Sequence, residues 1–397
     1  MTCCRADPTR QPLKSHVPAD AEKDVIVRQV MRSGGIPGIQ TVVVNRDGVL
    51  WQKSYGYAIL AQPGPVTPMR DDSLLYTCSV SKIVTAIAVM QQVEKGRITL
   101  DDDINKSLPF SLRNPKWPEV PITWRMLMTH SSSIDVDQSV EDAVYSYGID
   151  SPMSLESYIE SALKPGGAQY RVESFRQRAP GTERIYSDIA VDLLGYALTR
   201  VVHEDFSSYV ERAIFAPLQM TGVTYLPSRV PTQKLVVGYG RTKDSGRWRF
   251  STNRVAFAHL PAGRTAREEL MSSPDPPAGG LYSSAGQFAK LVTMFLNGGK
   301  IGEARILEQS SVKQLATFSG LWSIYGYQQG LTIYAPRDLN DHLVWGHDGE
   351  DRGYVGAAFF DLDAGIGAIA FANANREDFL LSRRLVDLDL HMMDWYK

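Results

Sequence analysis

A serine and a lysine three residues apart, in the run Ser79-Val80-Ser81-Lys82, are well placed for covalent catalysis. Residues three apart on a helix are neighbours, so the Lys82 amine can reach the Ser79 hydroxyl. The positive end of a helix favours an alkoxide-like oxygen and lowers the proton affinity of a buried lysine beside it. The pattern predicts a nucleophilic Ser79 with Lys82 as its base. Taken alone, Ser-x-x-Lys is more typical of an N-cap serine beside a solvated lysine.

Other common signatures are absent from the sequence. It contains no Gly-x-Ser-x-Gly elbow, no phosphate-binding Gly-x-x-x-x-Gly-Lys-Ser/Thr loop and no His-Glu-x-x-His pair. The cysteines are Cys3, Cys4 and Cys78, which have no zinc-site spacing and cannot form a disulfide framework. We therefore expect no cofactor and no metal.

Composition narrows the choice of partners. The 397 residues are 43% hydrophobic and 22% charged, as in ordinary globular proteins, and the formal net charge is −2. This charge provides no general attraction to nucleic acid or anionic lipid. The longest apolar runs fall short of the roughly 20 residues that span a bilayer, and the polar N-terminal residues do not look like a secretory signal. We expect no nucleic-acid or membrane partner and a cytoplasmic location.

The hydrophobic pattern predicts the elements that position the chemistry. A period of 3.6 predicts a helix from Ser79 to Lys95, with Ser79 at its N-terminal end. Strand patterns lie near both ends of the sequence, and most of the middle reads as helices and long polar loops. Strands are predicted at 38–44, 49–58, 330–334, 343–345, 353–361 and 367–372, and further helices at 21–32, 189–202, 284–296 and 379–395.

These elements predict an α/β fold of the α+β type, in which an antiparallel sheet is flanked by helices and interrupted by a helical insertion. We expect a flexible tail over residues 1–20. The sheet domain would comprise 21–110 plus 278–397, and the inserted, mainly helical domain 111–277. The weakly periodic stretch 222–277 is longer than most connections, which suggests a functional loop or a small subdomain.

Two further segments change the interpretation of the serine and lysine. Tyr186-Ser187-Asp188 precedes a predicted helix, and Gly346-His347-Asp348-Gly349 follows a predicted strand. Ser-x-x-Lys, Tyr-x-Asn and Lys/His-x-Gly, in this order, resemble the serine β-lactamase and penicillin-binding-protein superfamily. The branch that the chain resembles most is that of class C β-lactamase-related esterases, peptidases and acyltransferases. Leu127 to Ser132 and Gly279 to Ser284 extend the resemblance, which covers about residues 22–390.

The resemblance implies a role for each matched position. Ser79 would form an acyl-enzyme, Lys82 would take its proton, and Tyr186 would pass a proton to the leaving group. The backbone N–H groups of Ser79 and Glu350 would form the oxyanion hole. The positions implied in substrate binding are Asp188, Trp345, His347 and Gly349. His130 and Cys78 are expected to be structural.

Two departures from the pattern bear on the substrate. Asp188 replaces an asparagine, and beside Lys82 it would favour the charged amine. Asp188 could instead point away as a helix N-cap, be protonated, or leave more of the base role to Tyr186. His347 replaces a lysine in the region where β-lactamases and cell-wall peptidases hold a substrate carboxylate. Because acidic residues also surround these motifs, we expect a neutral ester, thioester or amide.

Four functions remain open on sequence grounds. The first is a serine hydrolase acting on a small-molecule ester, thioester or amide. The second is an acyltransferase that passes the acyl group to an alcohol or amine in small-molecule biosynthesis. Tyr145, Tyr147, Trp248 and Phe250 could build a pocket for that acceptor or belong to the core. The other two are a catalytically weak binding protein on the same fold, and a β-lactamase or D-amino-acid peptidase.

Overall fold

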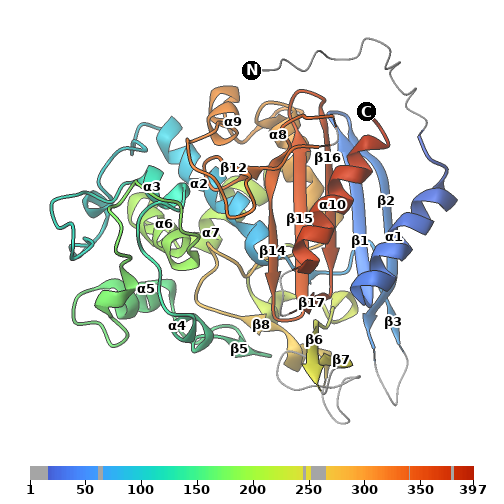
Figure 1. Cartoon of the computed structure of the whole chain (residues 1–397), viewed down its shortest axis with the longest axis horizontal. Helices are drawn as coiled ribbons and strands as arrows, with labels where there is room; N and C mark the ends of the chain where they lie inside the picture. Colours follow the sequence, from blue (N-terminus) through green and yellow to red (C-terminus); the bar gives the residue numbers. More distant parts are fainter. Residues whose placement is uncertain (1–16, 61–65, 245–246, 252–264, 339, 377–379) are drawn as a thin grey trace, which may run out of the picture.

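An eight-stranded antiparallel sheet forms the centre of the molecule, in the order β12-β13-β14-β15-β16-β1-β2-β3 (Figure 1). The computed structural model describes residues 17–60, 66–244, 247–251, 265–338, 340–376 and 380–397. The strands are β1 (Gly38–Asn45), β2 (Gly48–Ile59), β3 (Thr67–Pro68), β12 (Gln328–Gln329), β13 (Tyr334–Ala335), β14 (Trp345–Asp351), β15 (Tyr354–Asp361) and β16 (Ile366–Ala372). The predicted α/β fold with an antiparallel sheet is confirmed.

The two ends of the sequence meet in the middle of this sheet. β1 pairs with β2 through the turn at Asn45 to Gly48 and with β16 on its other side, where Ile39 lies opposite Ala372. Since β15 and β16 also pair, segments from the first 60 and the last 50 or so residues form one continuous sheet. The strands predicted near both ends therefore belong together, as expected.

Helices cover both faces of the sheet, which explains why β1 is apolar on both sides. The helices are α1 (Asp20–Gly34), α2 (Lys82–Glu94), α3 (Trp124–Met128), α4 (Gln138–Asp142), α5 (Leu155–Leu163), α6 (Asp188–Val202), α7 (Phe206–Val210), α8 (Ala285–Leu296), α9 (Gln309–Leu315) and α10 (Leu380–Asp394). α1 and α10 lie on one face and α8 on the other (Figure 1). Along β1, Val42 joins the core under α8 and Val43 the core under α10, because alternate residues point to opposite faces.

The helical part of the molecule packs around α2 and α6. α2 contacts α6, and α6 also contacts α3 and α5. Short strand pairs tie the loops of this region together: β4 (Leu75–Tyr76) with β9 (Tyr282–Ser283), β5 (Ser146–Tyr147) with β8 (Met271–Ser272), β10 (Lys300–Ile301) with β11 (Ala304–Arg305), and β6 (Tyr239–Asp244) between β7 (Arg247–Ser251) and β17 (Ala374–Arg376). No helix in the described part of the chain is long and apolar enough to cross a bilayer.

Three predicted elements differ in the structure. The strand predicted at 330–334 is mostly a tight turn between β12 and β13, since Gly330 N–H donates to Ile333 O and Thr332 has φ +69°. The strand predicted to end at Trp345 begins there, so the Gly346-His347-Asp348-Gly349 motif lies within β14. Ser79 lies in a short 3₁₀ turn, η1 (Cys78–Ser81), that leads into α2.

The predicted division into a sheet domain and an inserted domain stays a prediction. Most of the predicted tail over 1–20 lies outside the described residues, and α1 begins at Asp20. The side chains of Trp248 and Phe250 also lie outside the described part of the chain.

Candidate active site

Ser79 and Lys82 are in direct contact. The 3₁₀ turn brings residues three apart almost into line, and the distance from Lys82 Nζ to Ser79 Oγ is 2.9 Å. The Lys82 side chain is fully buried. The serine and lysine thus lie as their spacing predicts, although a 3₁₀ turn rather than the first α-helical turn carries the serine.

Two acceptors fix the direction of the Lys82 amine. Its Nζ donates to the main-chain oxygen of Ala278 at 2.6 Å and forms an ion pair with Asp188 Oδ1. Neither a carbonyl nor a carboxylate oxygen can donate, so the amine gives N–H groups to both. The remaining position on nitrogen faces Ser79 Oγ, and in the neutral amine this position is a lone pair. The arrangement can therefore accept the hydroxyl proton of Ser79.

Asp188 points toward Lys82. The helix α6 is capped by Ser187, whose hydroxyl accepts from Ala190 N–H, so the N-cap interpretation of Asp188 is wrong. Burial by itself lowers the pKa of Lys82, but the charge of Asp188 outweighs it and the net pKa is raised. The lysine is therefore a strong base that holds its proton at neutral pH.

Tyr186 approaches Ser79 from the other side. Its hydroxyl lies 2.9 Å from Ser79 Oγ, and its ring stacks on His130 with centroids 4.5 Å apart. His130 Nδ1 accepts from Ser187 N–H at 3.3 Å, which holds the histidine ring in the Tyr-x-Asp segment. Burial, followed by the charge of Asp188, raises the pKa of Tyr186, so its hydroxyl keeps its proton. His130 thus supports Tyr186 through packing.

Strand β14 lies against the serine turn. A Cβ on Gly349 would lie 2.5 Å from Ser79 N and 2.9 Å from Cys78 Cβ, so only glycine leaves the space in front of the Ser79 N–H. Asp348 N–H donates to the Tyr334 hydroxyl, away from β15. Because main-chain N–H groups alternate in direction along a strand, Glu350 N–H faces the same open edge as Asp348 N–H.

The remaining predicted residues fall into two groups. His347 and Glu350 line the cavity in front of Ser79, and the Glu350 carboxylate accepts from Ser382 N–H at 3.0 Å. Trp345 is 5% exposed and is not among the residues that line the cavity; it packs in the core close to Gly330. Cys78 is buried, and burial raises the pKa of its thiol, as suits a structural residue.

Ser79 opens into a cavity of about 720 Å³. One wall carries acidic residues that the motifs did not indicate, among them Glu141 and Asp275. Tyr145, an aromatic residue of the predicted insertion, lies on this wall, and its hydroxyl donates to Asp351 at 2.7 Å. Short helices and loops far apart in the sequence bring these residues together, so no local pattern could have revealed them.

Another part of the cavity lining is apolar. Ile324 and Tyr325 line the cavity yet are 85% and 46% exposed, and Tyr334 lies deeper on the same side. Trp322 and Phe318 continue this apolar surface with their rings 4.9 Å apart. The sequence motifs did not indicate these residues.

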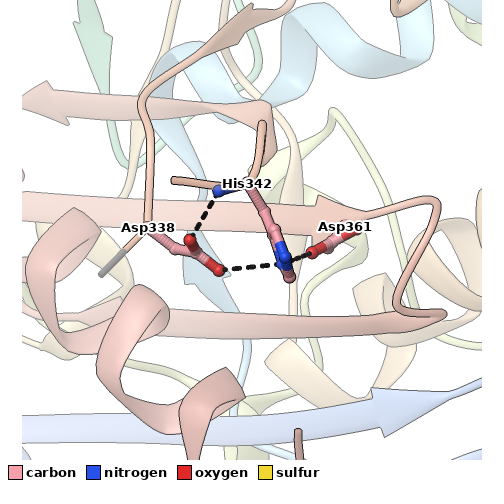
Figure 2. A group of neighbouring side chains, drawn as sticks. All are labelled: Asp338, His342 and Asp361. Atoms are coloured by element: carbon pink, nitrogen blue, oxygen red, sulfur yellow. Dashed lines mark hydrogen bonds and ion pairs between the residues drawn. The ribbon is translucent and has the colours of Figure 1, made fainter. Parts of the chain in front are cut away.

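One group of side chains has the composition of a metal site, but a lysine lies against it. Figure 2 shows His342 between Asp338 and Asp361, with its Nδ1 3.5 and 3.3 Å from their Oδ2 atoms. The Lys397 ammonium forms ion pairs with both carboxylates. In the described residues this is the one group whose three ligand atoms lie within 4.8 Å of one another. Its two carboxylates already have a cation, and it lies apart from the residues that line the cavity.

With this geometry established, comparison with known proteins identifies the family. The sequence model of the β-lactamase family matches residues 24–391. The chain belongs to this family, and its fold is that of the hydrolases of the serine β-lactamase and penicillin-binding-protein superfamily.

Curated relatives are distant in sequence. Protein flp of Staphylococcus aureus is 24% identical over 216 residues, which are 54% of this chain but only 40% of flp. A putative D-alanyl-D-alanine carboxypeptidase of Escherichia coli is 26% identical, over 72% of this chain and 66% of that protein. The match thus spans less than half the length of the first relative.

Solved structures share the fold along nearly the whole chain. The D-amino acid amidase of Ochrobactrum anthropi has a TM-score of 0.69 at 18% identity, covering 94% of this chain and 97% of that one. EstCE1, a hydrolase with promiscuous acyltransferase activity, has a TM-score of 0.67 at 19% identity and coverages of 95% and 98%. Simvastatin synthase (LovD) of Aspergillus terreus has a TM-score of 0.68 at 19% identity and coverages of 96% and 100%.

Proposed function

We propose that this protein is a serine hydrolase that forms an acyl-enzyme at Ser79 with an uncharged ester, thioester or amide bond of a small molecule. The observation that carries the proposal is the position of one hydroxyl between two proton-transfer groups. Ser79 Oγ lies 2.9 Å from Lys82 Nζ and 2.9 Å from the Tyr186 hydroxyl. A nucleophile within hydrogen-bond reach of a base that is itself oriented by a third group is the arrangement that nucleophilic catalysis needs.

In this mechanism the neutral form of Lys82 is the base. It takes the Ser79 proton as Oγ attacks the carbonyl carbon, and Tyr186 gives its proton to the leaving oxygen, sulfur or nitrogen. The Lys82 ammonium then restores the Tyr186 proton. Water enters where the leaving group was, gives a proton to Lys82 or Tyr186 and attacks the acyl carbon. The acyl–Oγ bond then breaks, the acid is released, and the proton returns to Ser79 Oγ. Because Asp188 raises the pKa of Lys82, the rate should rise toward alkaline pH.

The main-chain N–H groups of Ser79 and Glu350 are the proposed oxyanion hole. The close approach of Gly349 to Ser79 N and the outward direction of Glu350 N–H support this assignment. Two such donors stabilise the negative charge that develops on the carbonyl oxygen.

The substrate preference follows from the walls of the cavity. The acidic wall disfavours a substrate carboxylate, and His347 supplies no cation because burial lowers its pKa to about 3. Ile324, Tyr325 and Tyr334 would accept an apolar part of the substrate. An apolar substrate without a carboxylate fits both walls.

Acyl transfer to an alcohol or amine is the second candidate. The cavity of about 720 Å³ has room for an acyl group and a separate acceptor together. The likeness in fold to EstCE1, a hydrolase with promiscuous acyltransferase activity, also favours this alternative. Product analysis after incubation with an activated ester, with and without added amines or alcohols, would separate transfer from hydrolysis.

Covalent labelling tests the proposal directly. Treatment with a fluorophosphonate should add one phosphonyl group to Ser79, detectable by mass spectrometry, and the Ser79→Ala protein should remain unlabelled. Hydrolysis of p-nitrophenyl esters should be lost in the same variant. If Ser79 forms no adduct at any pH, the proposed hydrolase is wrong and a binding protein on this fold becomes the better description.

The remaining predictions have simple readouts. Turnover of nitrocefin would indicate β-lactamase activity, and release of D-alanine from a D-alanyl peptide would indicate a peptidase. The cytoplasmic location stays a prediction, which cell fractionation would test.

A further inference from the structure

Most carboxylates that line the cavity have partners within the protein. Asp142 forms an ion pair with Arg352, Asp351 accepts from Tyr145, and Asp348 accepts from Tyr334. These groups are neutralised or hydrogen-bonded, so they need no ligand.

Glu141 is different, because no described residue forms a hydrogen bond or ion pair with its carboxylate. It lies on α4, partly buried in the cavity wall. Burial, followed by the charges of Asp188 and Asp275, raises the pKa of Glu141 to about 9. Among the charges that act on it most strongly, Lys82 alone is positive. Arg352, a cation of the same cavity lining, is paired with Asp142.

Asp275 faces the same shortage of positive charge. It is 8% exposed, and among the described residues its carboxylate has a hydrogen bond from the hydroxyl of Ser273 alone. Burial raises its pKa to about 6, and the charges of Asp188 and Asp351 contribute. Lys82 is a positive charge that acts on both acids, but its amine is bonded to Asp188, Ala278 and Ser79.

His347, which lines the same cavity, adds an independent observation. Its Nδ1 is bonded to the main-chain oxygen of Asp348, which can only accept, so Nδ1 carries the ring proton and Nε2 is a lone-pair acceptor. Nε2 is buried and has no partner among the described residues, and the whole residue is 2% exposed. The cavity lining thus holds a second acceptor that has no partner among the described residues.

We propose that the substrate of this site carries a protonated amine, which binds against Glu141 and Asp275 while the uncharged ester or amide bond lies at Ser79. An ammonium group would supply a positive charge to the two acids. It would also supply an N–H donor to the unpaired nitrogen of His347. A metal ion fits less well, because the one compact set of three metal-binding side chains among the described residues is Asp338, His342 and Asp361, elsewhere in the fold. This inference rests on the proposed hydrolase and names its substrate class.

Matched pairs of esters test the inference. p-Nitrophenyl 6-aminohexanoate and p-nitrophenyl heptanoate differ by an ammonium in place of a methyl group on the acyl side. 6-Aminohexyl acetate and heptyl acetate make the same change on the alcohol side. We expect the cationic member of at least one pair to have a kcat/KM at least about tenfold higher, with the ratio falling as salt is added. The pair that shows the preference identifies the side on which the amine lies.

Variants then connect the preference to the carboxylates. Glu141→Gln and Asp275→Asn should each reduce the ratio of cationic to neutral kcat/KM severalfold. Glu119→Gln is the matched control, because it removes the same charge from an exposed residue outside the cavity wall and should leave the ratio unchanged.

Two failures can be told apart. Equal turnover of both members of each pair, or a preference for the neutral ester, with Ser79 still labelled by fluorophosphonate, would refute the amine site and leave the hydrolase intact. Equal loss of the ratio in Glu119→Gln would also refute the site, since the effect would then be one of net charge. Absence of both ester turnover and labelling would instead refute the proposed hydrolase.

Discussion

At the scale of residues, the unusual feature is a carboxylate where the family pattern has an amide. Asp188 and the carbonyl of Ala278 both accept from Lys82, so the direction of the amine does not depend on whether residue 188 is aspartate or asparagine. The proton affinity of the Lys82 amine does depend on the residue at position 188, because only aspartate brings a negative charge. Asp188 therefore gives the site a stronger base that is deprotonated in fewer molecules at neutral pH.

The substitution Asp188→Asn should move the pH dependence of catalysis to lower pH. Removing the carboxylate charge lowers the pKa of Lys82, so the neutral amine becomes available at lower pH. We expect the midpoint of the rise in kcat/KM to fall by about one to three pH units, the usual effect of one close opposite charge. The pH profile with a p-nitrophenyl ester measures it. An unchanged midpoint would mean that Lys82 is not the titrating base.

At the scale of elements, the contact between η1 and β14 determines whether the site can work. The 3₁₀ turn presents Ser79 N, and β14 approaches it so closely that only a glycine fits at position 349. Gly349 lies opposite Gly356 of β15, so neither of these adjacent strands has a side chain at this position beside the turn. This contact joins residues about 270 positions apart in the sequence.

The substitution Gly349→Ala should therefore reduce kcat, and it should also lower thermal stability because its Cβ would meet main-chain atoms of the serine turn. Its Cβ would occupy the space in front of Ser79 N, so that this N–H could no longer donate to the carbonyl oxygen of the substrate. Loss of one oxyanion donor costs about 10²- to 10³-fold in kcat. Gly356→Ala is the matched control, because its Cβ would meet Phe371 and Val80 side chains rather than Ser79 N. We expect that variant to lose some thermal stability but to keep most of its activity. Similar losses of kcat in both would argue against the oxyanion assignment.

At the scale of the whole molecule, α1 and α10 complete the core on the face of the sheet away from α8. Two charged features are buried there or close to it. Asp389 on α10 is fully buried, and neither of its oxygens has a partner in the described part of the chain. Lys397, which follows α10, is tied to Asp338 and Asp361 (Figure 2).

Asp389→Leu should stabilise the protein. Burial raises the pKa of Asp389 well above its usual value, so the folded state keeps a proton that the unfolded state releases. The free energy of unfolding is therefore lowered as pH rises above the ordinary pKa of aspartate. We expect a gain of about 1–3 kcal/mol at pH 7 and a smaller gain near pH 4, measured by urea unfolding. Glu303→Gln, at an exposed turn, should have no such effect; a destabilised Asp389→Leu protein would contradict the argument.

Lys397→Met should destabilise the protein. Asp338 and Asp361 have side chains that are 0% and 2% exposed, so removing their cation leaves buried charge uncompensated. Breaking a buried pair in this way costs about 3–5 kcal/mol, and the partial exposure of His342 nearby should reduce the loss. Thermal unfolding would show the lower midpoint, and an unchanged midpoint would mean that solvent already screens the pair.

The sequence by itself determined the local chemistry of this protein. Ser79 and Lys82 are three residues apart, and any helical turn brings such residues into contact; the strand patterns near both ends likewise predicted a shared sheet. The tertiary structure alone decided that Asp188 contacts Lys82 rather than capping its helix, because Ser187 takes the cap. It also decided that Trp345 belongs to the core and that Glu141 and Asp275 face the nucleophile, since these contacts depend on how distant segments pack, which no short pattern encodes.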